Sequence, residues 1–192
     1  MADQISPWPF QSDSVSEYAW INDAFSVVEI DKIIELGKKD ALSKATVLGN
    51  DETARDSNIG WLRPEPDTDW LFRRMTDIIT EVNAQYFGFE LYGLIEGFQF
   101  TEYQAPGGHY TYHTDRSSGK LVRKLSLTMQ LSNPDDYEGG DLEFLFGKEP
   151  ISASREQGTI TFFPSWALHR VTPVTSGTRR SLVAWVTGPN FK

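Results

Sequence analysis

The chain has 192 residues and a formal net charge of −9, with 27 acidic against 18 basic side chains. A protein that neutralises nucleic-acid phosphates normally carries a basic stripe, so this balance argues against a nucleic-acid partner. Cysteine is absent from the sequence, which excludes disulfides and thiolate ligands or nucleophiles. No apolar run approaches the roughly 18 residues of a membrane span, and the N-terminus lacks the pattern of a signal peptide. We therefore expect a cytoplasmic protein without a membrane partner.

The first half of the chain contains two helical patterns and a long polar stretch. Residues 1–20 have no hydrophobic period and predict an irregular arm. Apolar positions at helical spacing predict one helix over residues 27–39 and a second over residues 70–86. The stretch 45–66 is rich in Gly, Asn, Asp and Pro and predicts a long loop or a loose hairpin. We expect the two helices to cover one face of a sheet.

From residue 91 onward, short strand-like runs alternate with turn signals. The eight expected strands cover residues 91–103, 109–114, 121–131, 141–146, 151–153, 158–163, 167–172 and 180–187. This pattern predicts a mainly β fold with flanking N-terminal helices, a cupin-like double-stranded β-helix or jelly roll. We expect a single domain over residues 1–192. Residues 1–90 would supply the arm, the helices and the long polar stretch, and residues 91–192 the β core.

A His-x-Asp pair in the expected second strand indicates a metal site. On an extended strand, side chains two apart share one face, so His113 and Asp115 can offer a nitrogen and an oxygen to one point. His169, in another expected strand, would complete a facial triad of two histidines and one carboxylate. Such a triad leaves positions of the metal open, as a non-haem Fe(II) oxygenase requires. The alternatives are that the histidines merely pack or hydrogen-bond, and that Asp115 caps the turn that follows it.

From about residue 45 to residue 188 the chain resembles the 2-oxoglutarate/Fe(II)-dependent dioxygenases of the prolyl 4-hydroxylase type, especially the bacterial and phage-like PKHD-type hydroxylases. The matching blocks are residues 55–57 with Trp61, 96–100, Tyr103, 107–110, 113–115, 127–134, 139–142, 158–159, 162–165, 169–174 and 177–179. The resemblance implies Fe(II) held by the triad, 2-oxoglutarate and O2 as cosubstrates, and ascorbate as a further ligand to consider.

The resemblance also suggests which residues bind 2-oxoglutarate. Arg179, six residues before Trp185, matches the arginine that holds a carboxylate of the cosubstrate, and a guanidinium fork suits that task. Neighbours on a strand face opposite ways, so Arg180 is the alternative. Tyr103 matches a tyrosine that hydrogen-bonds the cosubstrate near the metal, the alternative being a packed core tyrosine.

At residue 130 the sequence departs from the family pattern. Some prolyl hydroxylases have a tyrosine at the aligned position, which contacts the far carboxylate of the cosubstrate, whereas this chain has Gln130. The contact is then made by the Gln130 amide, by a hydroxyl such as that of Thr128 or Ser126, or by no residue.

The expected function is hydroxylation of a carbon centre, first of all a prolyl residue in a peptide or protein, with residues 47–60 folding over the bound peptide. Two alternatives remain open. One is oxidation of a free amino acid or another small metabolite, and the other is a jelly-roll binding module without catalysis.

Loops near the mouth of a jelly roll commonly carry specificity. Four residues are candidates for substrate contact on this basis, each with plain packing as the alternative: Arg55, Trp61, Tyr112 and Trp166. His109 is expected to support the rim of the pocket rather than to bind the metal. The cluster of Lys120, Arg123 and Lys124 is expected to form a solvated face, with binding of an acidic substrate as the minor alternative.

Overall fold

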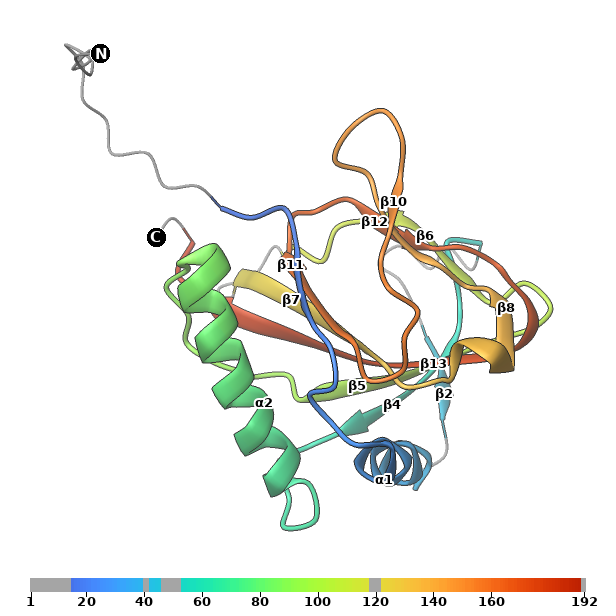
Figure 1. The fold of residues 1–192 in the computed structure, drawn as a ribbon, viewed down its shortest axis with the longest axis horizontal. Helices are drawn as coiled ribbons and strands as arrows, with labels where there is room; N and C mark the ends of the chain where they lie inside the picture. Colours follow the sequence, from blue (N-terminus) through green and yellow to red (C-terminus); the bar gives the residue numbers. More distant parts are fainter. Residues whose placement is uncertain (1–14, 40–41, 46–52, 118–121, 191–192) are drawn as a thin grey trace.

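The structure is a computed structural model and describes residues 15–39, 42–45, 53–117 and 122–190. Two antiparallel sheets face each other, and two helices lie on the outer side of the larger sheet (Figure 1). Helix α1 spans Val27–Lys38, and α2 spans Asp69–Val82 and continues into a π-helical turn over Asn83–Phe87. The fold is thus the mainly β architecture with flanking helices that the sequence predicts.

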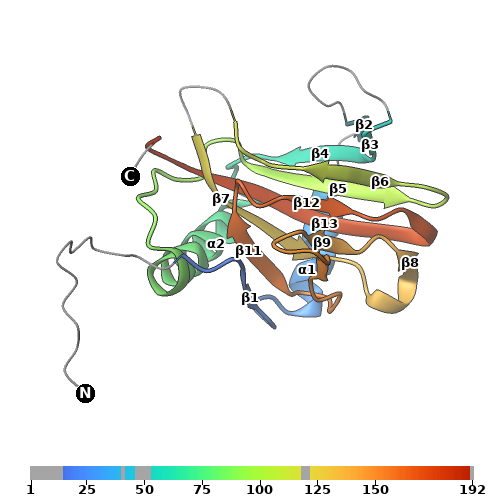
Figure 2. The same cartoon turned by 90° about the horizontal axis from the view of Figure 1, so that it is seen from above.

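The two sheets are unequal in size. The larger contains, in spatial order, β1 (Ala19–Ile21), β11 (Ile160–Pro164), β7 (Val122–Gln130), β13 (Val174–Gly188), β5 (Phe98–Gln104), β4 (Asn58–Leu62) and β2 (Ser43–Lys44), with β8 (Tyr137–Gly139) paired to β13. The smaller contains, in order, β10 (Ile151–Ser152), β9 (Leu142–Phe144), β12 (His169–Val171), β6 (His109–His113) and β3 (Arg55–Asp56). A 3-10 turn over Pro134–Asp136 precedes β8. Seen from above, β6 and β12 lie over β5 and β13 (Figure 2).

The large sheet has two chemically different faces, because successive side chains of a strand point to opposite sides. On β7, Leu125, Leu127 and Met129 are fully buried in the core that the sheet forms with the helices. The residues between them, Ser126, Thr128 and Gln130, are buried on the side of the small sheet. The same alternation on β5 and β13 gives an apolar face toward the helices, while the face toward the space between the sheets mixes polar residues with Val183 and Trp185.

Specific interactions stabilise both ends of helix α1. Ser26 caps its N-terminus and forms a capping box with Glu29, so two otherwise unpaired backbone N–H groups are satisfied. Near its C-terminus, Gly37 lies directly on the ring of Phe100 in β5. The missing side chain at Gly37 is what lets the helix approach the sheet closely.

Four expectations about secondary structure need correction. The stretch 45–66, expected to be a long loop or a loose hairpin, contains β3 and β4, which pair with β6 and β5 and not with each other. The pairing of β4 with β5 along its whole length outweighs the loop-like composition. The expected strand 91–103 begins only at Phe98, and the expected strand 180–187 begins earlier, at Val174. The expected irregular arm contains β1, which pairs with β11. Residues 1–14 and 46–52 lie outside the described residues.

The expected solvated cluster is also wrong for two of its three members. Arg123 pairs with Glu96 and lies with its guanidinium 3.8 Å from the centre of the Trp185 ring. Lys124 is buried at 8% exposure. The register of β13 on β7 shifts at this point, where β7 carries one extra residue, so the simple alternation of exposed and buried positions fails. Lys120 lies outside the described residues.

In the part of the chain that the structure describes, no helix is both long and apolar enough to cross a membrane.

The close packing of Gly37 generates a prediction about stability. A Cβ added at this residue would lie 2.4 Å from the Phe100 ring. We expect Gly37→Ala to lower the free energy of unfolding by about 1–3 kcal/mol through overpacking, although alanine is the better helix former. Urea unfolding followed by circular dichroism measures the change. The control Glu35→Ala, at an exposed position of the same helix, should stay within about 0.5 kcal/mol of the parent. A Gly37→Ala protein as stable as the control would contradict this account of the packing.

Candidate metal centre

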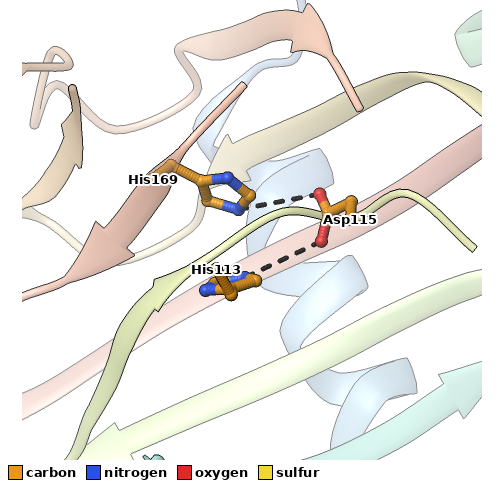
Figure 3. Close-up of side chains that lie close together, drawn as sticks. All are labelled: His113, Asp115 and His169. Carbon is orange, nitrogen blue, oxygen red and sulfur yellow. Dashed lines mark ion pairs between the residues drawn. The ribbon is translucent and has the colours of Figure 1, made fainter. Parts of the chain in front are cut away.

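The two histidines and the aspartate of the expected triad meet between the sheets. His113 ends β6 and His169 begins β12, and the two residues are directly opposite each other in the antiparallel pairing of these strands. Asp115 follows two residues after His113, where the chain has left the strand. Figure 3 shows the three side chains pointing toward one another.

The donor atoms are spaced as three ligands of one ion must be. His113 Nε2 lies 3.7 Å from Asp115 Oδ1, and His169 Nε2 lies 3.6 Å from Asp115 Oδ2. All three groups offer ligand atoms within 4.8 Å of one another. Donors that each lie about 2 Å from a common ion are separated by distances of this order. The residues present therefore fit a divalent metal.

Backbone carbonyls fix which nitrogen each histidine presents. Nδ1 of His113 lies 2.8 Å from the carbonyl oxygen of Thr111, and Nδ1 of His169 lies 2.9 Å from that of Ala167. A carbonyl can only accept, so each Nδ1 carries the proton and donates it. Each Nε2 is left with its lone pair facing Asp115, which is the form that binds a metal.

The electrostatics of the site favour the metal-binding protonation states. Burial, reinforced by the neighbouring His169, lowers the pKa of His113 from 6.5 to about 4, against the opposing effect of Asp115. Burial alone would raise the pKa of Asp115, but His169 and His113 outweigh it and the net direction is downward. The imidazole of His113 is therefore neutral and the carboxylate ionised at neutral pH.

Tyr110 also lines the site, although in the sequence it stands out only as part of the matching block 107–110. Its ring stacks on the His113 ring at 3.4 Å between centroids and 17° between planes. Residues three apart on a regular strand face opposite ways, which is why alternation does not predict this contact. The register of β12 on β6 shifts here: three residue steps on β6, from Tyr110 to His113, match only two on β12. This bulge brings Tyr110 to the side of the triad.

The triad lines a cavity that extends to Arg179. Arg179 is 2% exposed, and its Nη2 donates to Oε1 of Gln130 at 2.9 Å. Tyr103 lies opposite Arg179 in the pairing of β5 with β13, and its ring centre is 5.5 Å from the guanidinium carbon. Arg180 faces the other way and pairs with Glu102. Of the two arginines, Arg179 is the one that lines the cavity.

Thr128 and Gln130, which were also expected near the cosubstrate, differ in whether they line the triad cavity. Thr128 lines the triad cavity. Gln130 is absent from the wall of that cavity and lines an adjoining one, where its amide is bonded to Arg179 and to the Tyr137 hydroxyl.

Only one of the four expected substrate contacts lines the triad cavity as the described residues define it. Arg55 does so: it donates to Ser57 and Gln99 and lies 4.7 Å from the centre of the Tyr110 ring. Trp61 is 38% exposed and its ring lies 6.2 Å from that of Trp185, while Trp166 is 50% exposed beside Phe89.

Tyr112 and His109 are engaged elsewhere. The Arg170 guanidinium lies over the Tyr112 ring at 4.6 Å. The ring nitrogens of His109 lie 2.8 and 2.9 Å from the carbonyl oxygens of Gly107 and Thr53, so this histidine links two backbone segments.

The geometry agrees with comparisons to known proteins. Residues 98–187 match the model of the 2OG-Fe(II) oxygenase superfamily, and this range contains the triad and Arg179. The matched range covers slightly under half of the chain.

Among curated relatives, a PKHD-type hydroxylase of Shewanella sp. (strain ANA-3) is 38% identical over 94 residues, which is 45% of this chain and 41% of the relative. A PKHD-type hydroxylase of Psychrobacter sp. (strain PRwf-1) is 43% identical over 96 residues, or 45% of this chain and 36% of the relative. The match thus spans about two fifths of the length of these relatives.

Two solved structures share the fold. A prolyl-4-hydroxylase of Pseudomonas putida superposes with a TM-score of 0.71 at 22% identity, covering 91% of this chain and 94% of that one. A prolyl hydroxylase of Trichoplax adhaerens, in complex with a peptide fragment of the hypoxia inducible factor oxygen degradation domain, gives a TM-score of 0.74 at 17% identity, covering 89% and 83%.

The triad geometry predicts metal binding that depends on three residues. We expect His113→Ala, Asp115→Ala and His169→Ala each to abolish stoichiometric binding of Co(II), because each leaves only two donors. Titration followed by the visible absorption of the bound ion measures this. The control His109→Ala removes the remaining one of the three histidines of the chain and should bind Co(II) as the parent does. Loss of binding in the control, or its retention in Asp115→Ala, would contradict the assignment.

The low pKa of His113 predicts acid sensitivity of the metal-free protein. The unfolded chain takes up this proton near pH 6.5 and the folded protein only near pH 4. Between these values the unfolded state binds more protons, so stability falls as the pH falls, by up to about 1.4 kcal/mol per pH unit. We expect His113→Gln to show a flatter decline in the free energy of unfolding between pH 6.5 and 4.5, measured by urea denaturation with chelator present. Parallel curves for the two proteins would contradict this origin of the acid sensitivity.

Proposed function

We propose that this chain is an Fe(II)- and 2-oxoglutarate-dependent dioxygenase that hydroxylates a carbon centre, most specifically a prolyl residue in a peptide or protein. In the overall reaction 2-oxoglutarate and O2 are converted to succinate and CO2. One oxygen atom enters succinate and the other enters the substrate, whose C–H becomes C–OH.

The observation that carries the proposal is the unpaired positive charge of Arg179 in the wall of the triad cavity. Among the described residues, no carboxylate forms an ion pair with Arg179, and its one side-chain hydrogen bond goes to a neutral amide. A buried charge without a counter-charge is costly. A carboxylate of a bound ligand would supply that counter-charge through a bidentate pair. A metal triad and an anion-binding arginine on one cavity are what a metal-dependent enzyme with a dicarboxylic 2-oxo acid cosubstrate needs.

Each residue would then have a defined task. His113, Asp115 and His169 would hold Fe(II), which supplies the oxidative chemistry when bound with O2 and the 2-oxo acid. Arg179 would hold the far carboxylate of 2-oxoglutarate, and Tyr103 and Thr128 would line the part of the cavity that binds 2-oxoglutarate. No side chain has to act as a general base, because the hydrogen leaves a carbon through redox chemistry.

Two observations support a prolyl substrate in a peptide. The relatives are PKHD-type hydroxylases, and the structural neighbours include prolyl hydroxylases, one of them bound to a peptide fragment. Arg55 lies at the triad cavity on β3, the end strand of the small sheet, so an extended chain would reach the cavity along this edge. We propose Arg55 as a peptide contact on this basis.

Turnover of 2-oxoglutarate tests the proposed activity. The protein is loaded anaerobically with Fe(II), then exposed to O2 with 2-oxoglutarate and ascorbate, with and without proline-rich peptides. We expect peptide-stimulated succinate together with a gain of one oxygen atom on the peptide, measured by mass spectrometry. Stimulation by free amino acids or other metabolites alone would move the substrate to small molecules. No turnover in protein that binds iron would favour a binding module and overturn the proposal.

The role of Arg179 predicts a separable defect. We expect Arg179→Met to weaken 2-oxoglutarate binding by about 2–5 kcal/mol, thirtyfold or more in KM, because the carboxylate loses its counter-charge. Co(II) binding by the triad should be retained. The matched control Arg180→Met removes the neighbouring charge, which faces Glu102 instead, and should leave the KM for 2-oxoglutarate unchanged. Equal effects of the two variants would argue for a non-specific charge effect.

A further inference from the structure

The orientation of the Gln130 amide follows from its contact with Arg179. A guanidinium can only donate hydrogen bonds, so the atom of Gln130 that faces Arg179 Nη2 at 2.9 Å must be the oxygen Oε1. The nitrogen Nε2 then points the other way, where it meets the hydroxyl of Tyr137 in a short hydrogen bond. Both ends of this amide are therefore occupied within the protein.

The same reasoning fixes the role of the Tyr137 hydroxyl. An amide nitrogen donates, so the oxygen of Tyr137 accepts from Gln130 and keeps its own proton for another partner. Among the described residues, no acceptor takes this proton. Tyr137 is 3% exposed, and its ring lies 4.3 Å from the Arg155 guanidinium carbon, which helps to hold the ring in place. A buried donor in a fixed position needs an acceptor, and either a water or an atom of a bound ligand would supply one.

The surroundings show where this ligand atom would lie. A second cavity is lined by Tyr137 and Gln130 and shares Thr128, Leu142 and Arg179 with the triad cavity. Gly140 keeps this region open: a Cβ there would lie 3.1 Å from Cδ of Arg179. The buried cation and the unused hydroxyl donor therefore line the same cavity, which adjoins the triad cavity.

We infer that Tyr137 is a specificity-determining residue that donates a hydrogen bond to the same carboxylate that Arg179 binds. A carboxylate has about four lone-pair sites, and a guanidinium fork occupies only two of them. The Tyr137 hydroxyl would occupy a third and would favour 2-oxo acids that carry a second carboxylate. The inference rests on the proposed function, because it assumes that the ligand of Arg179 is the cosubstrate.

Direct binding measurements test this role apart from catalysis. Mn(II)-loaded protein is titrated without O2 with 2-oxoglutarate and with 2-oxobutanoate, which has no distal carboxylate. We expect Tyr137→Phe to weaken 2-oxoglutarate binding about tenfold or more, as loss of a hydrogen bond to a charged group should, and to leave 2-oxobutanoate binding unchanged. Tyr18→Phe is the matched control, since this ring also packs against the core between the sheets.

Each outcome has a distinct meaning. Wild-type protein that does not prefer 2-oxoglutarate over 2-oxobutanoate would overturn the proposed anion site and this inference with it. A wild type that prefers 2-oxoglutarate, with Tyr137→Phe showing the same preference, would overturn only the inference and make Tyr137 a packing residue. Equal weakening for both ligands would also overturn it. If Tyr137→Phe fails to fold, Gln130→Leu is the second variant, because it removes the amide that holds the Tyr137 hydroxyl. We expect Gln130→Leu to show the same selective loss of 2-oxoglutarate binding. A Gln130→Leu protein without this selective loss would also overturn the inference.

Discussion

The structure depends on one constraint, which is that the central strands of the large sheet keep apolar and polar side chains on opposite faces. Leu125, Leu127 and Met129 bury one face against the helices, and this burial stabilises the fold. The opposite face is therefore free to carry polar groups such as Thr128 and Arg179 into a buried space. Those groups need partners there, since unpaired buried polar groups are costly.

The candidate metal site depends on a β-bulge, where the regular alternation of side chains on a strand is interrupted. The bulge in β6 adds one residue between Tyr110 and His113, so both side chains reach the same side of the small sheet. Tyr110 then covers the His113 ring and helps to exclude water from it. The burial that results keeps the imidazole neutral, and the two histidines keep Asp115 ionised. Packing thus sets the protonation states that bind a metal already in the metal-free protein.

The proposed anion site shows how neutral groups can hold a buried cation in place without satisfying its charge. Gln130 orients Arg179 through its oxygen and is itself fixed by Tyr137 through its nitrogen. This arrangement leaves the guanidinium ready for a carboxylate, with little side-chain reorganisation needed on binding. Tyr137 comes from β8, a strand that pairs only with β13 in the described part of the chain, and so connects the turn at residues 134–136 to the site.

The sequence by itself determined the fold class and both helices, because period-3.6 and period-2 patterns are local signals. It also predicted the metal triad from a His-x-Asp pair and a later histidine, and Arg179 from the resemblance to a known family. It did not determine β3 and β4 within the expected loop 45–66, because their pairing with β6 and β5 depends on partners about 40 residues or more away. Only the tertiary structure decided that the side chains of Tyr110 and Tyr137 lie near the site. A bulge turned Tyr110 to the face of the small sheet that carries the triad, and a hydrogen bond to Gln130 holds Tyr137 beside Arg179. Neither effect leaves a periodic signal in the sequence.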